Sequence, residues 1–306
     1  MTKRTQLFFF AVIFIVIIYF NSCKSFAPLI FPEWSKPLIE NSAYQCSMPF
    51  TLDGCNIIVE VEIGGKKYYF IIDSGCSSTS MDYDIAKSVS KVKAGSFLFL
   101  LPLKTAKIPS IKVGNLLFNN EKVVVFKKDK WNWPEQVTGL LGCDFLQKVS
   151  VTIDYEKDSV YLNMPGFIPD NYDGIIPLLT TKKAPLEPNF NVKINGVDGI
   201  MLFDMGNQFP DIFISTLFQK SNKSIFDSVQ IKEGYPWKIK RGLELQLDSL
   251  LFSDVTAYLL TEQDEPYETA GNIGCNLFMR LKSLTIDYSN EKLYYELKAL
   301  ETPPKR

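Results

Sequence analysis

Histidine is absent from this sequence of 306 residues. Because histidine is the usual general base of triads and a frequent zinc ligand, its absence excludes a Ser-His-Asp triad, a Cys-His nucleophile pair and a His-ligated zinc within the chain. Any catalysis would therefore depend on carboxylate, Lys, Tyr or Cys side chains. The 34 Asp and Glu residues make carboxylate chemistry the first expectation.

A strong net charge is also lacking, since 33 Lys and Arg residues balance the acidic ones to give a formal charge of -1. This balance gives no reason to expect electrostatic capture of nucleic acid. The composition, 46% hydrophobic and 22% charged, is ordinary for a globular protein. A chain of this length can form two modest domains, each with its own core.

The N-terminus carries an unbroken apolar run of 14 residues, Leu7–Phe20. The run is shorter than the roughly 20 residues of a membrane-spanning helix, and Lys3 and Arg4 precede it, as in a secretory signal. Cys23 follows Ser22 at the end of this segment, an arrangement that resembles a bacterial lipoprotein signal. We therefore predict that Cys23 is lipidated and becomes the mature N-terminus, which makes residues 1–23 the signal. The alternative is an uncleaved N-terminal anchor.

Both interpretations predict an exported protein attached to a membrane. Residues 24–43 contain three prolines and are expected to form a tether between the membrane and the first folded element. The predicted location is the bacterial cell envelope, on the periplasmic face of a membrane.

Cysteine is sparse, and five remain after Cys23: Cys46, Cys55, Cys76, Cys143 and Cys275. An odd number leaves at least one of them unpaired within a monomer. Cys46 and Cys55 bracket a short segment rich in turn formers, so they could close a small disulfide in an exported protein. They could equally be free thiols.

Three short motifs occur twice, in the same order, with offsets of 131, 132 and 133 residues. The pairs are Ile71–Gly75 with Leu202–Gly206, Gly139–Leu146 with Gly271–Phe278, and Val151–Tyr155 with Leu284–Tyr288. Such a recurrence indicates two copies of one structural unit. The boundary between the copies is expected near Pro165–Pro177, which is rich in proline and glycine.

Each copy is predicted to be rich in β-strands, because β-branched and aromatic residues alternate with turn formers. Expected hairpins or strands cover Ile57–Ile63 with Lys67–Ile72, Ile111–Phe126 with a turn at Asn119 and Asn120, Val149–Tyr155 with Ser159–Asn163, Asn191–Ile194, Ile200–Asp204, Leu243–Leu260 and Ser283–Glu296. Short helices are expected at Tyr83–Val89 and Leu277–Leu281. Many short strands favour an all-β fold of barrels or sandwiches.

Both copies of the first motif place an aspartate at the end of an apolar strand, with a glycine two residues later. The strand would hold Asp73 or Asp204 at the tip of a loop, and the glycine would allow a sharp turn. Approximate two-fold symmetry would then bring the two carboxylates face to face across a central cleft. Two such groups share a proton, so one can act as a general base on water while the other acts as a general acid.

Phe70–Thr79 resembles the active-site loop of clan-AA aspartic peptidases, whose signature is Asp-Thr/Ser-Gly. Gly139–Leu146 resembles the element that crosses behind that loop, and Val151–Tyr155 continues the pattern as in retropepsin-like bacterial aspartyl proteases. The resemblance covers about residues 55–163 and, more weakly, about residues 190–296. It implies two tandem closed β-barrel lobes, as in the pseudo-dimeric plan of pepsin-like enzymes.

In this resemblance Asp73 and Asp204 are the catalytic pair, and Ser74, Gly75 and Gly206 support the active-site loops. The expected lobes are residues 44–165 and a degenerate copy at 175–298.

The second copy departs from the family pattern at two positions. Met205 stands where the family has a hydroxyl that braces the two loops, and Asn272 stands where the first copy has Leu140. No flap tyrosine is found near Gly95, so the cover of the cleft would fall to Phe97 or Phe99.

Other residues near the motifs are expected to be structural. Asp154 and Asp287 would make turn contacts in the closing hairpins, Cys76 would be a packing residue without a histidine to activate it, and Cys143 and Cys275 would lie equally deep in their lobes. Trp131, Trp133 and Trp237 would belong to the core or the cleft wall.

These observations predict an exported aspartic endopeptidase that hydrolyses a peptide or protein through water activated between Asp73 and Asp204, as a monomer and without a cofactor or metal. An alternative is an inactive pseudoprotease that binds an extended peptide by strand addition. A third arrangement is a homodimer in which two first lobes supply two copies of Asp73.

Overall fold

The computed structural model describes residues 36–37, 45–97, 101–128, 134–179, 187–208, 210–227, 230–231, 238–261 and 269–299. The predicted signal with Cys23, most of the tether, Phe99 and the three tryptophans named above lie outside these ranges, as does the side chain of Phe97. Within the described ranges, no helix combines the length and apolarity needed to cross a membrane.

Strands dominate the described residues and run from β1 to β20. They are β1 (Gln45–Asp53), β2 (Asn56–Ile63), β3 (Lys66–Ile72), β4 (Ser80–Asp82), β5 (Val92–Phe97), β6 (Leu101–Val113), β7 (Leu116–Phe126), β8 (Val137–Leu141), β9 (Ser150–Asp154), β10 (Ser159–Asn163), β11 (Gly174–Pro177), β12 (Asn189–Ile194), β13 (Val197–Asp204), β14 (Ile212–Ile214), β15 (Gln230–Ile231), β16 (Lys238–Leu247), β17 (Leu250–Leu259), β18 (Gly271–Gly274), β19 (Leu281–Asp287) and β20 (Lys292–Leu297). The helices are α2 (Tyr83–Val89), α3 (Cys143–Leu146), α4 (Thr216–Ser221), α5 (Cys275–Phe278) and the 3-10 helix η2 (Lys223–Phe226).

The first copy of the repeat forms a closed barrel. Its strands follow the order β2-β3-β8-β4-β7-β6, and a pairing between β2 and β6 closes the ring. The pairs β3–β8 and β4–β7 are parallel, and the other pairs are antiparallel. Phe70, Phe118 and Phe145 are fully buried in this lobe, so their side chains contribute to the core of the closed barrel.

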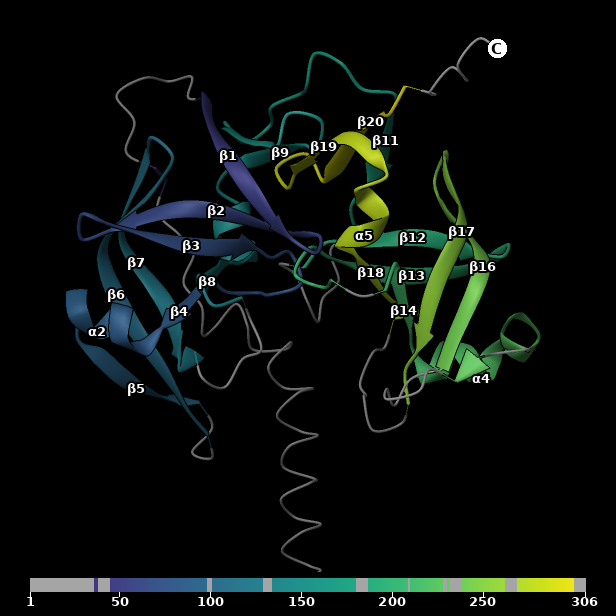
Figure 1. The fold of residues 1–306 in the computed structure, drawn as a ribbon, viewed down its shortest axis with the longest axis horizontal. Helices are drawn as coiled ribbons and strands as arrows, with labels where there is room; N and C mark the ends of the chain where they lie inside the picture. The colour runs from purple at the N-terminus through teal and green to yellow at the C-terminus, as the bar shows by residue number, and fades with distance from the viewer. Residues whose placement is uncertain are drawn as a thin grey trace, which may run out of the picture.

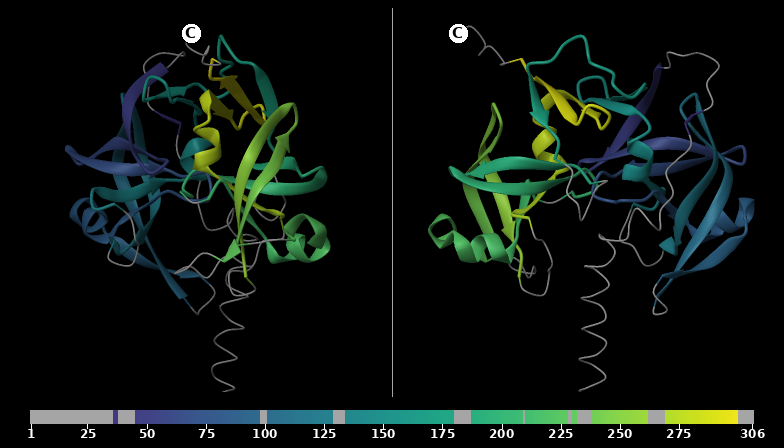
Figure 2. Two further views of the ribbon diagram at one scale, coloured as in Figure 1. Left: turned by 45° about the vertical axis from the view of Figure 1, so that its right-hand side comes forward. Right: turned by 180° about the vertical axis from the view of Figure 1, so that it is seen from behind.

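The second copy repeats this plan strand for strand. Its ring is β12-β13-β18-β14-β17-β16, closed by a pairing between β12 and β16, and its parallel pairs are β13–β18 and β14–β17. The two barrels lie side by side in every view (Figures 1 and 2). The predicted all-β fold of two tandem closed barrels is therefore confirmed.

A six-stranded sheet of order β11-β20-β19-β9-β10-β1 joins the two halves. At its centre β9 pairs with β19, so the closing hairpins of both copies meet, and the hydroxyls of Thr152 and Thr285 lie 2.8 Å apart. These two threonines occupy equivalent positions of the repeat, so the pseudo-two-fold axis that relates the two copies passes between them. Because this sheet takes strands from both copies, the domain bounds given above stay a prediction.

The element predictions are partly confirmed. The hairpin β2–β3 and the helix α2 lie where the sequence indicates, but the β6–β7 hairpin turns at Gly114 instead of Asn119 and Asn120. Gly114 takes a φ of +61° and makes the turn, whereas Asn120 adopts a φ of +61° inside the continuous strand β7. The turn prediction was wrong because Asn120, a residue type that favours turns, adopts its left-handed conformation inside a strand without reversing the chain.

One helix prediction also needs correction. The helix expected at Leu277–Leu281 begins earlier, at Cys275, and ends at Phe278, so that Leu281 already belongs to β19. Helix α4 was not predicted, although Ser215 precedes it as an N-cap and accepts a hydrogen bond from Phe218 N at 3.3 Å.

Cys55 forms a disulfide with Cys275, across 220 residues of sequence and between the two copies of the repeat. Cys55 therefore does not pair with Cys46, which is a buried free thiol whose sulfur accepts a hydrogen bond from Asn115 N at 3.3 Å. The small disulfide considered above was wrong because the turn between β1 and β2 directs Cys55 toward the second lobe. Cys143 and Cys275 are 0% and 1% exposed, which confirms their equal depth.

We predict that non-reducing peptide mapping recovers one linked pair, Cys55 with Cys275. The double variant Cys55→Ser/Cys275→Ser should lose about 4 kcal/mol of unfolding free energy, because a link across a long loop restricts the unfolded chain strongly. Denaturant unfolding measures this loss, and Cys46→Ala is the matched control for removal of a buried free sulfur. Recovery of a Cys46–Cys55 peptide, or of free thiols at both Cys55 and Cys275, would contradict this assignment.

Candidate active site

Two strands of equivalent position deliver the two aspartates. Asp73 directly follows β3, and Asp204 is the last residue of β13. Each strand pairs in parallel with a strand of its own barrel, β8 or β18, and Asp73 N donates to Leu141 O at 3.0 Å. The buried strands thus hold both carboxylates at the ends of well-supported loops.

The two carboxylates face each other across the junction of the lobes. A Cβ atom at Gly75 would overlap the carboxylate of Asp204, and a Cβ atom at Gly206 would overlap that of Asp73. The reciprocal contact requires glycine at both positions, because any side chain would push the opposing aspartate away. The structure thus brings together Asp73, Asp204, Gly75 and Gly206 within one chain.

Each aspartate is also held by its own loop. Asp73 Oδ1 accepts from Gly75 N at 2.9 Å, and Asp204 Oδ1 accepts from Gly206 N at 3.1 Å. These matched bonds fix the orientation of both carboxylates relative to the backbone and stabilise their ionised forms.

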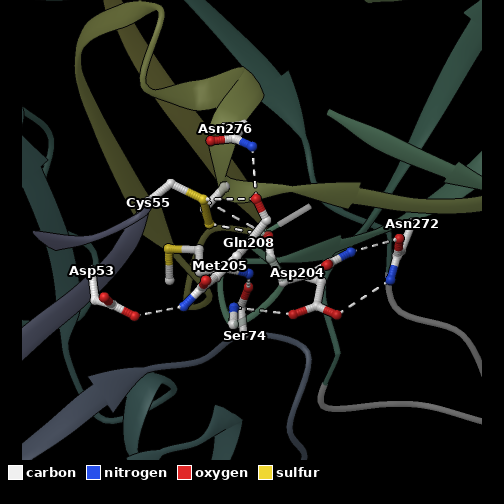
Figure 3. Close-up of a disulfide and its surroundings, with 11 residues drawn as sticks. Asp53, Cys55, Ser74, Asp204, Met205, Gln208, Asn272 and Asn276 are labelled. Atoms are coloured by element: carbon white, nitrogen blue, oxygen red, sulfur yellow. Dashed lines mark hydrogen bonds between the residues drawn. A yellow bond between two sulfur atoms is a disulfide. The ribbon is translucent and has the colours of Figure 1, made fainter. Parts of the chain in front are cut away.

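The hydroxyl of Ser74 ties the two loops together (Figure 3). Its Oγ donates to Phe203 O at 2.8 Å and accepts from Met205 N at 3.0 Å, and Ser74 is fully buried. Met205, the counterpart of Ser74 in the second loop, has no hydroxyl to make the equivalent bonds to the first loop. Its side chain is buried in the hydrophobic core. One hydroxyl therefore makes both bonds of the inter-loop bridge.

Asn272 contacts the second aspartate directly (Figure 3). Its Nδ2 donates to Asp204 Oδ2 at 3.3 Å, while its Oδ1 accepts from Asn207 Nδ2 at 3.1 Å. Leu140 occupies the matching place in the first barrel and offers no hydrogen bond. The sequence marked Asn272 as a departure from the family pattern, but not as a partner of Asp204.

The loop after Asp204 is held by contacts from both lobes (Figure 3). Gln208 Nε2 donates to Asp53 Oδ2 at 3.1 Å, and Gln208 O accepts from Asn276 Nδ2 at 2.7 Å. The sulfur of Cys275 lies 3.1 Å from Asn207 O, so the disulfide also packs against this loop. Three separate contacts therefore hold the second loop in place.

Burial governs the protonation of the aspartate pair. It raises the pKa of Asp73 from its ordinary value of 3.8 to about 6, with a smaller rise from the charge of Glu187 and opposing hydrogen bonds from the loop amides. Burial, and then the charge of Asp73, raise the pKa of Asp204 well above the same ordinary value. The pair consequently retains a proton into the mildly acidic to neutral range.

The remaining candidates have structural surroundings. Asp154 Oδ1 accepts from the amides of Glu156 and Lys157 at 3.1 and 3.0 Å in a hairpin turn. Asp287 likewise accepts from Gly166 N at 3.0 Å, and also from neighbours in its own turn.

Cys76 follows Gly75 in the first loop, and its sulfur donates to Ser78 O at 3.1 Å. Burial and the charge of Asp73 raise the pKa of this thiol well above its ordinary value. A protonated thiol is a poor nucleophile, which favours a packing role.

The site also contains a residue that sequence reasoning missed. Glu187 is buried beside the pair, and its Oε1 accepts from Ser77 Oγ at 2.9 Å. The repeat offers a signal for it, because Glu187 lies 17 residues before Asp204, the same spacing that separates Asn56 from Asp73. In the part of the chain that the structure describes, no group of three or more His, Cys, Asp or Glu side chains is arranged to hold a metal ion.

The paired barrels and the facing aspartates define an aspartic-proteinase fold. Residues 59–145, in the first lobe, match the family model described as aspartyl protease. The crystal structure of the aspartic proteinase from Irpex lacteus matches with a TM-score of 0.58 at 14% sequence identity, covering 85% of this chain and 99% of that chain. No curated protein matches the chain in sequence. The predicted resemblance to aspartic peptidases is confirmed by the family model and by the structural match.

We predict that Ser74→Ala lowers the free energy of unfolding by about 2 kcal/mol, because it leaves a buried amide and a buried carbonyl without their shared partner. Thermal and denaturant unfolding measure this change. Ser88→Ala is the matched control, since Ser88 Oγ bonds to Ile85 O on the exposed face of α2. Equal stability of the two variants would show that the inter-loop bridge contributes nothing to folding.

Proposed function

We propose that this protein is an aspartic-type endopeptidase that hydrolyses peptide bonds with a water molecule activated between Asp73 and Asp204. The observation that carries the proposal is the reciprocal approach of the two carboxylates over Gly75 and Gly206. Both carboxylates come from one chain, which supports a monomeric enzyme over a dimer of first lobes.

The shared proton gives the pair its chemistry. The ionised carboxylate removes a proton from water as the oxygen attacks the peptide carbonyl, and the protonated carboxylate donates its proton to the carbonyl oxygen. The resulting diol collapses when the aspartate that took the water proton donates it to the amide nitrogen, the other aspartate takes a proton from a diol hydroxyl, and the C–N bond breaks. This sequence returns the pair to one proton and consumes only water.

The departures in the second loop are offset by other contacts, which supports an enzyme over an inactive peptide-binding protein. Met205 has no side-chain hydroxyl, but the inter-loop bridge is still formed, because the Ser74 hydroxyl bonds to both Phe203 O and Met205 N. The polar residue in the second backing element, Asn272, donates to Asp204 Oδ2. Both changes therefore leave a supported carboxylate at Asp204.

Export to the cell envelope is part of the proposal. The apolar N-terminal run and Cys23 support a lipid-anchored protein on the periplasmic face of a membrane. The Cys55–Cys275 disulfide agrees with an oxidising compartment, where such bonds persist. A peptide or protein would be the substrate.

The first test is cleavage of a diverse peptide library by a soluble chain that begins after Cys23, followed by mass spectrometry across pH. Because the pKa values of both aspartates are raised, we expect activity to extend to a higher pH than a pair with ordinary pKa values would allow. Asp73→Asn and Asp204→Asn should each reduce kcat by at least about 1,000-fold, because each removes one half of the acid–base pair.

Loss of activity in Asp73→Asn alone would instead indicate a dimer of first lobes. A folded wild-type chain that cleaves no peptide at any pH would favour the peptide-binding pseudoprotease.

Asn272 provides a second test of the same function. Asn272→Leu installs the residue of the first barrel and removes the hydrogen bond to Asp204, so we expect kcat to fall about tenfold while KM changes little. Steady-state kinetics separate the two parameters, and thermal unfolding verifies the fold. Unchanged kcat in a folded variant would show that Asn272 does not orient Asp204.

A further inference from the structure

Glu187 occupies a place in the second barrel where the first barrel has a neutral residue. In the register of β12 and β13, Asn189 pairs with Leu202, and Phe203 N donates to Pro188 O at 2.8 Å. Continuing this register by one further residue places Glu187 opposite Asp204. Asn56 is its counterpart opposite Asp73, since Ile58 pairs with Ile71 in β2 and β3.

The carboxylate of Glu187 is enclosed at the junction of the lobes. Glu187 is 6% exposed, and its Oε1 accepts from Ser77 Oγ at 2.9 Å, four residues after Asp73 in the opposite loop. A charge held this far from bulk water acts on its neighbours with little screening. A buried carboxylate therefore lies across from one member of the pair and is bonded to the loop of the other.

The titratable groups that the charge of Glu187 reaches come from several elements. They are Asp73 and Cys76 in the first loop, Asp204 at the end of β13, Cys143 in α3 and Tyr288 in the turn after β19. For Asp73 and Asp204 the charge of Glu187 adds to the rise in pKa that burial causes. A negative neighbour favours the protonated form of both aspartates.

We propose that Glu187 is a positioning residue of the active site, which through its negative charge extends the pH range over which Asp73 and Asp204 share a proton. This inference rests on the function proposed above. It explains why the second barrel has the carboxylate of Glu187 where the first barrel has the neutral side chain of Asn56. A third carboxylate beside the pair keeps one aspartate protonated closer to neutral pH.

The test is a pH titration of the aspartate side chains by carbon-13 NMR, in a chain labelled at the aspartate carboxyl carbons. Spectra of Asp73→Asn and Asp204→Asn assign the two signals. In Glu187→Gln the amide oxygen can still accept from Ser77, so this hydrogen bond stays while the charge is lost. We expect the titration of the pair to move about one pH unit lower.

Three matched variants separate charge from structure. Glu187→Asp keeps the negative charge and should move the midpoints less than Glu187→Gln does. Ser77→Ala removes the hydrogen bond but keeps the charge, and should also move them less. Asp53→Asn removes the carboxylate from the other hydrogen bond between an active-site loop and the opposite lobe, in which Gln208 Nε2 donates to Asp53 Oδ2 at 3.1 Å. This variant should leave the titration midpoints of the aspartate pair in place.

A second readout is the pH profile of peptide cleavage. In Glu187→Gln the alkaline limb of kcat/KM should move to lower pH by the same amount as the NMR midpoints. Unmoved midpoints in Glu187→Gln, or an equal shift in Ser77→Ala, would overturn the role of the Glu187 charge. A wild-type chain without cleavage would refute the proposed function, while the NMR titration would still decide the effect of Glu187 on the pair.

Discussion

The close approach of the Asp73 and Asp204 carboxylates is the constraint on which the rest of the structure depends. Each aspartate carboxylate occupies the space that a side chain at the opposing glycine would need. The backbones of the two loops therefore approach each other closely. Barrel strands deliver both loops from behind, and the six-stranded sheet holds the barrels together through β9 and β19. The Ser74 hydroxyl then fixes the loops to each other. Small errors in any of these layers would separate the carboxylates.

The two halves have diverged around this fixed centre. Ser74 and Met205 share one hydroxyl between two loops, and Asn272 offers a hydrogen bond to Asp204 where its counterpart offers none. The polar additions lie in the second half, whose loop also carries the disulfide contact and the bridge from Gln208. The altered second motif therefore comes with additional contacts that hold its aspartate and its loop.

Much of this arrangement could be predicted from the sequence, because the repeated motifs encode strands whose spacing survives duplication. The strand patterns, Asp73 and Asp204 at matching positions of the repeat, and the resemblance of Phe70–Thr79 to an aspartic-peptidase loop together predicted paired carboxylates in an all-β fold. Several other contacts between residues far apart in the chain were not predicted. Cys55 reaches Cys275 only because the lobes pack as they do, and Glu187 lies opposite Asp204 only through the register of β12 and β13. Local patterns also misplaced the β6–β7 turn, since Asn120 accommodates its left-handed conformation inside a strand.

The raised pKa values oppose stability at neutral pH. A carboxyl whose pKa is higher in the folded than in the unfolded chain stabilises the fold fully below the ordinary value of 3.8, and this contribution is lost as the pH rises through about 6. An aspartate pair that works closer to neutral pH must therefore be held by interactions that do not titrate there. The disulfide and the Thr152–Thr285 contact between the closing hairpins meet that requirement, because neither changes protonation in this range. The disulfide and the threonine contact thus join the lobes throughout this pH range, while the junction itself carries acidic groups.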